Sequence, residues 1–172
     1  MALVPEDGTG LSTADSFCSQ AEATTYFTAQ ASPSDWTDAT SAQKDSALRY
    51  AARWLGAHYS WPGWILSLTQ RLQWPRTGAY DSDGRNLSTW SVVKDLYLIP
   101  AQCEIAGEHL RKAINLAREA SGEIKSVEID VLSVTYMDHA PLSNEFDGLS
   151  YVDEILAPVV GAEEFSIRTA RG

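Results

Sequence analysis

Histidine is the side chain that most often performs acid–base chemistry near neutral pH, and this chain has three histidines. They are His58, His109 and His139, and they fall in three separate segments. The sequence has no His-x-x-x-His or Glu-x-x-His pair for a metal ion, no Gly-x-Ser-x-Gly nucleophile motif and no Gly-x-x-x-x-Gly-Lys phosphate loop. The residue types that usually carry catalysis are therefore not grouped for it.

Carboxylates and thiols form no recognisable site either. Glu163 and Glu164 lie in a polar stretch, where we expect no burial to tune a carboxyl pKa. Two cysteines, Cys18 and Cys103, are too few for a zinc site or a disulfide framework, so we expect both to be packing residues. Residues 81–84 (Asp-Ser-Asp-Gly) have the acidic pattern of a calcium loop, but Val92 stands where its bidentate Glu is required. We expect no enzyme activity, no cofactor and no metal.

Base stacking is a second kind of chemistry, for which residues 59–85 supply aromatic and basic side chains. Stacking of a base on Trp or Tyr contributes about 1–3 kcal/mol and tolerates any base sequence. The residues available for such a platform are Trp61, Trp64, Trp74, Tyr80, Arg71, Arg76 and Arg85. Between two predicted helices, the same residues also fit a loop that packs on a helical bundle, and the net charge favours this second interpretation.

The net charge argues against a tight contact with nucleic acid. The chain has 13 Lys and Arg against 23 Asp and Glu, which gives a net charge of −10. Binding to a phosphate backbone requires Lys and Arg to replace its counterions. The excess of acid is greatest in residues 123–172, which carry ten acidic and three basic residues. No basic stripe compensates elsewhere, so the chain repels DNA on average.

The elements that must position these residues are mostly helices. A chain of 172 residues, 44% of them hydrophobic, is long enough for one domain with its own core, and no apolar run approaches the ~18 residues of a membrane span. Capping boxes begin at Ser19 and Thr40 and predict helices to about Gln30 and Ala57. The second helix has an apolar face at helical spacing, formed by Ala47, Leu48, Ala51, Ala52, Leu55 and Tyr59.

The second half of the chain mixes helix with a short β segment. Residues 92–120 are predicted to be mostly helical, with Pro100 as a break or as the start of a fresh helix. Over residues 124–137, β-branched residues partly alternate with charged ones, which predicts a strand or hairpin. A short helix is expected over residues 149–156 and is expected to end before Pro158.

The sequence therefore predicts a mainly α protein: a small helical bundle with a short β-strand or hairpin segment and extended arms. Residues 1–16 form the expected N-terminal arm, residues 17–160 the helical domain and residues 161–172 a C-terminal docking tail. In an extended tail Phe165 and Ile167 would share one face. We expect Phe165, Ile167 and Arg168 to dock on a partner by strand addition, and the tail to be disordered when the protein is free.

Residues 69–78 (Thr-Gln-Arg-Leu-Gln-Trp-Pro-Arg-Thr-Gly) and the following Asp-Ser-Asp-Gly-Arg resemble a family of tailed bacteriophages and prophages. The resemblance continues in Ala-Asp-Ser at residues 14–16 and in residues 152–158, so it covers nearly the whole chain. Trp-Pro-Arg-Thr-Gly is its most specific part. The resemblance implies a structural role for the motif residues Trp74, Pro75, Arg76 and Gly78.

Members of this family are often labelled DnaT-like single-stranded DNA-binding proteins, and they also look like adaptors that form a ring beneath the phage portal. The second likeness implies a homo-oligomeric ring of twelve subunits in the virion neck, assembled in the host cytoplasm. Its partners would be the portal and a stopper or tail-completion protein, and DNA would pass through without tight binding. An acidic lumen suits that role, whereas a single-strand binder needs a basic groove. The alternatives are a single-strand binder in replication and another virion part, such as a tail-completion protein.

Overall fold

The computed structural model describes residues 2–30, 34–120 and 150–160, with side chains left undescribed at residue 34 and in residues 112–120. The described part is mainly helical with one short antiparallel strand pair, which confirms the predicted fold class. In chain order the elements are α1 (Gln20–Ala29), α2 (Ser34–Asp38), α3 (Ser41–His58), β1 (Trp64–Ile65), β2 (Arg76–Thr77), α4 (Trp90–Val93), the π-helical turn Lys94–Leu98, α5 (Ile99–Ala120) and α6 (Ser150–Val160).

The first and third helices begin where the capping boxes predict. The Ser19 hydroxyl accepts a hydrogen bond from the backbone N–H of Glu22, and the Glu22 carboxylate accepts one in return from the Ser19 N–H. Thr40 and Gln43 make the same exchange at the start of α3. Each box satisfies backbone donors that a helix start otherwise leaves unpaired.

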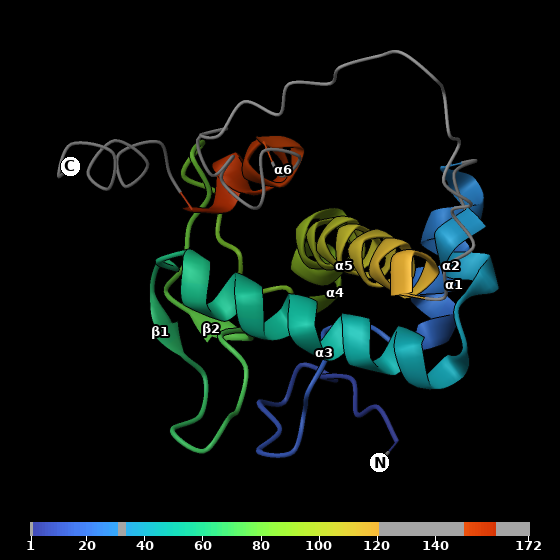
Figure 1. Cartoon of the computed structure of the whole chain (residues 1–172). Coiled ribbons are helices and arrows are strands. Elements are labelled where there is room, and N and C mark those ends of the chain that lie inside the picture. The colour runs from blue at the N-terminus through green and yellow to red at the C-terminus, as the bar shows by residue number, and fades with distance from the viewer. Residues whose placement is uncertain (1, 31–33, 121–149, 161–172) are drawn as a thin grey trace, which may run out of the picture.

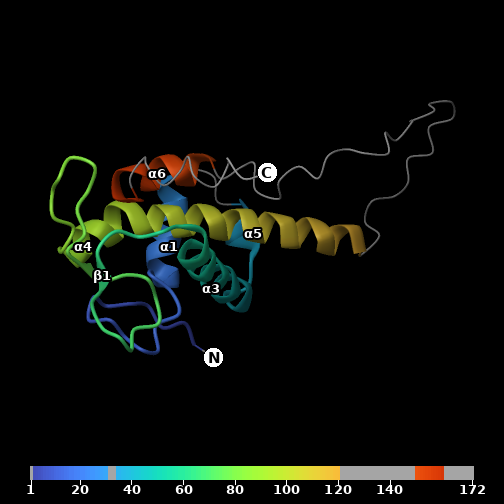
Figure 2. The ribbon, with the colours of Figure 1, turned by 90° about the vertical axis from the view of Figure 1, so that its left-hand side faces the viewer.

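Helix α5 is the central element of the bundle. It contacts α1, α2, α3 and α6, and its buried residues include Ala101, Ile105 and Ala106. Figure 1 shows α6 on one side of α5 and α3 on the other, with the strand pair beside one end of α3. Figure 2 shows that the C-terminal turns of α5 extend past both α3 and α6.

The apolar face predicted for α3 packs against α5. The buried residues of α3 are Ala47, Leu48, Ala51, Ala52 and Leu55, and Tyr59 just after the helix is also buried. Three of the five helical residues are alanines, so the two helices can approach closely. The 3–4 spacing in the sequence therefore predicted the buried face of α3 correctly.

Pro100 does not break the helical run. The π-helical turn lies directly before it, and Pro100 is the second residue of α5. Proline lacks an N–H and crowds the carbonyl of the preceding turn, so a widened turn upstream accommodates it without a break. The run is thus continuous from Trp90 to Ala120, with a change of pitch where the sequence suggested an interruption.

The N-terminal segment differs from the extended arm that its small polar residues predict. Glu6 is 1% exposed, and its carboxylate accepts hydrogen bonds from the backbone N–H groups of Gly8, Gly10 and Leu11. Pro5 and Ser16 form a parallel bridge, which brings the two ends of the segment together. The segment from residue 2 to residue 16 is therefore a folded loop attached to the domain, held by a buried carboxylate.

Helix α6 also differs from its prediction, because it continues through Pro158 to Val160. Pro158 has no N–H to donate to the preceding turn, but its carbonyl accepts a hydrogen bond from the Ser82 N–H at 2.8 Å, which ties the last turn to a neighbouring loop. Burial of Val152, Leu156 and Val159 holds the helix on α5.

The predicted strands over residues 124–137 lie outside the described residues. The observed strand pair instead joins Trp64 to Thr77 and Ile65 to Arg76. None of the described helices is both long and apolar enough to cross a membrane.

Candidate functional site

The Trp-Pro-Arg-Thr-Gly motif lies in the loop that carries β1 and β2, and its tryptophan is part of the core. Trp74 is 1% exposed and is the largest of the fully buried side chains. Its ring meets the edge of Trp61 with centroids 6.0 Å apart and an interplanar angle of 88°. The peptide bond between Trp74 and Pro75 is cis. A ring buried in this way cannot stack on a nucleic-acid base.

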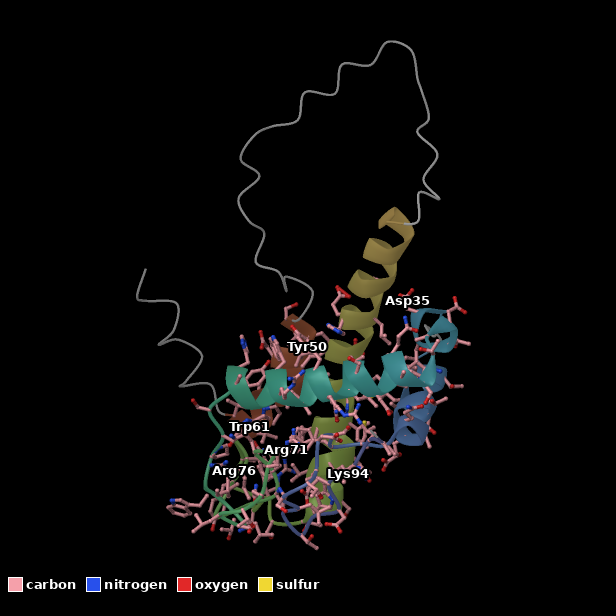
Figure 3. The ribbon with its side chains drawn as sticks, turned by 60° about the horizontal axis from the view of Figure 1, so that its bottom comes forward. Asp35, Tyr50, Trp61, Arg71, Arg76 and Lys94 are labelled. Carbon is pink, nitrogen blue, oxygen red and sulfur yellow. The ribbon has the colours of Figure 1, made fainter. Side chains whose placement is uncertain are left out.

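The motif arginine binds the loop to itself. The Arg76 guanidinium donates to the carbonyl oxygens of Pro62 at 2.6 Å, Gly63 at 2.7 Å and Gln73 at 3.2 Å. Burial of this guanidinium lowers the pKa of Arg76 from its ordinary value. Figure 3 shows Trp61, Arg71 and Arg76 together beside the loops at the C-terminal end of α3. Each of the three guanidinium nitrogens of Arg76 thus donates to a backbone carbonyl, so this side chain holds the loop together.

The motif glycine supports an exposed tryptophan. Gly78 has a φ of +65°, and a Cβ on it would lie 2.8 Å from a ring carbon of Trp64. Trp64 is 72% exposed, and Leu66 and Leu68 nearby are 50% and 94% exposed. The loop therefore has two sides, because Trp74 fills the core while Trp64 lies on the surface.

Residues 81–85 form a tight turn. One carboxylate oxygen of Asp81 accepts from the N–H groups of Asp83 and Arg85. The Arg85 guanidinium pairs with Asp81 at 2.8 Å and with Asp83 at 2.7 Å. Arg85 is therefore neutralised inside its own turn.

The stacking platform considered from the sequence is not assembled as a set. Two of its aromatic residues, Trp64 and Tyr80, are exposed, whereas Trp74 is buried. Several other cations of the described chain also have internal partners: Lys94 pairs with Glu22, Arg111 with Asp35 and Glu108, and Lys44 lies 5.4 Å from the centre of the Trp36 ring. A continuous basic groove is therefore not a feature of the described surface.

Three arginines do converge on one concave site, here called the arginine cleft. It has a volume of about 410 Å³ and lies between α3, the N-terminal segment and residues 71–73. Its lining residues are Asp15, Arg49, Ala52, Arg53, Gly56, Ala57, Arg71, Leu72 and Gln73. Arg49 pairs with Asp15 at 2.6 Å, and Asp15 also accepts from the Val4 N–H. The cleft thus joins a cationic rim to a floor of small apolar residues.

The sequence did not predict the cleft, although Arg49 and Arg53 lie four residues apart on α3. One feature of the sequence did indicate space there: the two arginines have i, i+4 spacing, and the small residues Ala52 and Gly56 beside them leave space under the two arginine side chains. The other wall comes from Arg71 and Leu72, whose approach to α3 depends on the loop fold. Helical spacing alone cannot predict that approach.

The remaining candidates take structural positions. The ring of His109 stacks on Tyr50 with centroids 4.1 Å apart, and burial lowers the pKa of His109. Cys18 and Cys103 are free and buried, which confirms them as packing residues. Within residues 2–30, 34–120 and 150–160, no group of three or more His, Cys, Asp or Glu is placed to hold a metal ion. His139 and the tail residues Phe165, Ile167 and Arg168 lie outside the described residues.

Comparison with known families matches residues 1–172 to the family described as "Putative DnaT-like ssDNA binding protein". The match covers the whole chain, so the chain belongs to this family. No curated protein and no solved structure matches it.

Proposed function

We propose that this member of the DnaT-like family is a non-catalytic head–tail adaptor of a tailed bacteriophage. In this role, copies of the chain form a ring between the portal and the tail or stopper, and packaged DNA passes through the ring. The chain would work in the virion neck by contact between proteins. The proposal rests on the resemblance of residues 69–85 to phage proteins and on how the structure uses its cations.

The observation that carries the proposal is the internal use of basic side chains in an acidic protein. Arg76 is bound by backbone carbonyls, and Arg85 and Lys94 are paired with carboxylates. With a net charge of −10, such a surface repels a phosphate backbone. A ring around sliding DNA benefits from that repulsion, because tight binding would stop the movement.

Single-stranded DNA binding in replication is the second candidate. The family description names this function, and it therefore supports this candidate more directly than the adaptor role. Two structural features also suit it: Trp64 is exposed enough to stack on a base, and residues 71–73 of the loop between β1 and β2 line the arginine cleft. Another virion part, such as a tail-completion protein, is a third role compatible with the same fold.

We expect the purified chain to show no sub-micromolar, salt-sensitive binding to single-stranded DNA at physiological salt. The reason is electrostatic, since 23 acidic residues outnumber 13 basic ones. Fluorescence anisotropy with a labelled thymidine oligonucleotide, repeated across a salt series, measures this directly.

The variant Trp64→Ala, which removes the exposed tryptophan, is the control for this titration. Sub-micromolar binding that weakens steeply with salt, and that Trp64→Ala reduces, would support the single-strand binder and overturn the adaptor. Binding that Trp64→Ala leaves unchanged would also count against the adaptor, and would direct attention to the arginine cleft.

The adaptor role itself is tested by mixing the chain with the portal protein of the same phage. We expect a ring on one end of the portal in negative-stain images, and the resemblance implies twelve subunits. An equimolar mixture in which the chain stays monomeric and leaves the portal bare would contradict the proposal.

A further inference from the structure

The arginine cleft contains two cations, Arg53 and Arg71, that have no carboxylate partner among the described residues and are exposed. Arg49 is held by Asp15 at 2.6 Å and lies 3.9 Å from Asp45. Among the residues that the structure describes, by contrast, Arg53 and Arg71 make no ion pair. Arg53 makes one long hydrogen bond of 3.4 Å to the Arg49 carbonyl, which leaves most of its donors unused.

The shape of the cleft suits a short peptide with acidic and apolar side chains. Its floor is formed by Ala52 and Gly56 of α3, and a Cβ on Gly56 would lie 3.3 Å from the Gln73 side chain. Leu72 and Ala57 add apolar wall beside the guanidinium groups. An occupant would therefore need carboxylates for the rim and a hydrophobic side chain for the wall.

We propose that the arginine cleft binds residues 163–167 (Glu-Glu-Phe-Ser-Ile) of a second copy of this chain. Glu163 and Glu164 would pair with Arg53 and Arg71, because guanidinium groups bind carboxylates through two parallel hydrogen bonds. Phe165 follows at once and would lie against the apolar wall. This inference deepens the adaptor proposal, since a tail seated in a neighbour's cleft links subunits head to tail, as a closed ring requires.

The ring proposal favours a second copy over the tail of the same chain, because a ring needs contacts between subunits. Two residues, Gly161 and Ala162, separate the end of α6 from Glu163, so Glu163 lies within about 11 Å of Val160. Figures 1 and 2 show α6 across α5 from α3 and from the N-terminal segment that borders the cleft. Helix α6 approaches the end of α3 near Asp153, which accepts a hydrogen bond from Tyr59, and the tail leaves α6 seven residues later, at Val160.

A nucleic acid is the less suitable occupant. Asp15 lies in the cleft, and the surrounding protein has a strong excess of acid. A phosphate backbone extends past any single cleft and would meet that excess along its length. A five-residue peptide with two carboxylates is short enough to stay within the cleft, so it does not meet the acidic residues of the surrounding surface.

The experiment uses full-length variants and labelled peptides of residues 161–172, with binding measured by fluorescence anisotropy. The receptor carries Glu163→Lys and Glu164→Lys, so its own tail does not compete for its intact cleft. We expect the wild-type peptide to bind this receptor, and a peptide with both Lys substitutions to bind at least tenfold more weakly. A second receptor, with Arg53→Glu and Arg71→Glu, should reverse this preference.

The reversed peptide preference of the second receptor distinguishes a loss of charge recognition from a loss of the folded structure. Both substituted arginines are exposed, and a variant that had merely unfolded would bind neither peptide. The matched control receptor adds Lys44→Glu to the two Lys substitutions in the tail. This changes the charge of α3 outside the cleft and should leave binding of the wild-type peptide unchanged.

Two outcomes would overturn this inference: equal binding of both peptides to both receptors, or no binding of the wild-type peptide to the first receptor at millimolar protein. Loss of oligonucleotide binding on Arg53→Glu and Arg71→Glu, without any peptide preference, would also overturn it and identify a nucleic-acid site. The adaptor proposal has its separate test in ring formation on the portal, so the two can fail independently.

Discussion

Replacing Trp74 with alanine should lower the free energy of unfolding by about 3–5 kcal/mol, the usual cost of truncating a large buried aromatic side chain. Trp74 is 1% exposed and packs edge-on against Trp61, which in turn contacts Tyr59 at the end of α3. Its loss would open a cavity between the loop and the bundle. Small domains have about 5–15 kcal/mol of total stability, so we expect a large fall in melting temperature or failure to fold.

Two further variants make this result specific to burial. Trp64→Ala removes the same side chain from a site that is 72% exposed and should change the melting temperature little. Trp74→Phe should cost clearly less than Trp74→Ala, because it keeps an aromatic ring and removes an indole N–H that has no hydrogen-bond partner among the described residues. Thermal denaturation followed by circular dichroism measures all three. Equal melting temperatures for Trp74→Ala and wild type would show that the motif tryptophan is not part of the core.

The helical part of the fold was largely predictable because its signals are local. A capping box needs residues three apart, and the apolar face of α3 repeats within one helix. The end of α6 was predicted wrongly for the same reason. Pro158 is a strong local stop signal, but the burial of Val159 and the bond from Ser82 to the Pro158 carbonyl stabilise the last turn from outside the helix.

The N-terminal segment shows where local reasoning stops. Its glycines and small polar residues are typical of an extended arm, and Glu6 would ordinarily be assigned to solvent. The structure buries Glu6 by giving its carboxylate three backbone donors from the same loop. The sequence spacing of Gly8, Gly10 and Leu11 does not by itself show that their N–H groups point at Glu6. They do so only when the loop is folded, and that fold also involves the distant Arg49, which pairs with Asp15.

The candidate site was predictable in part. The resemblance singled out Trp74, Pro75, Arg76 and Gly78, and the structure places them within one loop, where Trp74 and Arg76 hold that loop together. The arginine cleft was not predicted, because its walls come from three segments of the chain. Arg71 and Leu72 line the cleft with residues of α3, although they are 22 and 23 residues away from Arg49 in the sequence.

A buried amide connects the folded N-terminal segment to the bundle, and its loss is the second large effect we expect. Gln102 of α5 is 0% exposed. Its side-chain oxygen accepts from the Phe17 N–H at 3.0 Å, and its nitrogen donates to the Ser16 hydroxyl and to the Leu48 carbonyl, each at 2.8 Å. One side chain therefore joins α5, α3 and the start of the domain.

Gln102→Leu should lower the free energy of unfolding by about 2–4 kcal/mol, because each buried polar group left unpaired costs about 1–3 kcal/mol. The Phe17 N–H in particular would lose its acceptor. Chemical denaturation at neutral pH measures the change, and Gln30→Leu, at an exposed position after α1, is the matched control that should change little.

Gln102→Glu tests the same hydrogen bonds through pH. A carboxylate can accept from Phe17 but cannot donate to the Leu48 carbonyl, and burial disfavours its charge, so the pKa of the new carboxyl should lie above its ordinary value. The folded state then binds the proton more tightly than the unfolded state. The destabilisation should be largest at neutral pH and should shrink as the pH falls through the raised pKa towards about 4.3, the ordinary value for Glu. A penalty relative to wild type that stays constant from pH 7 to pH 4 would contradict this account, because a purely steric defect has no proton to bind.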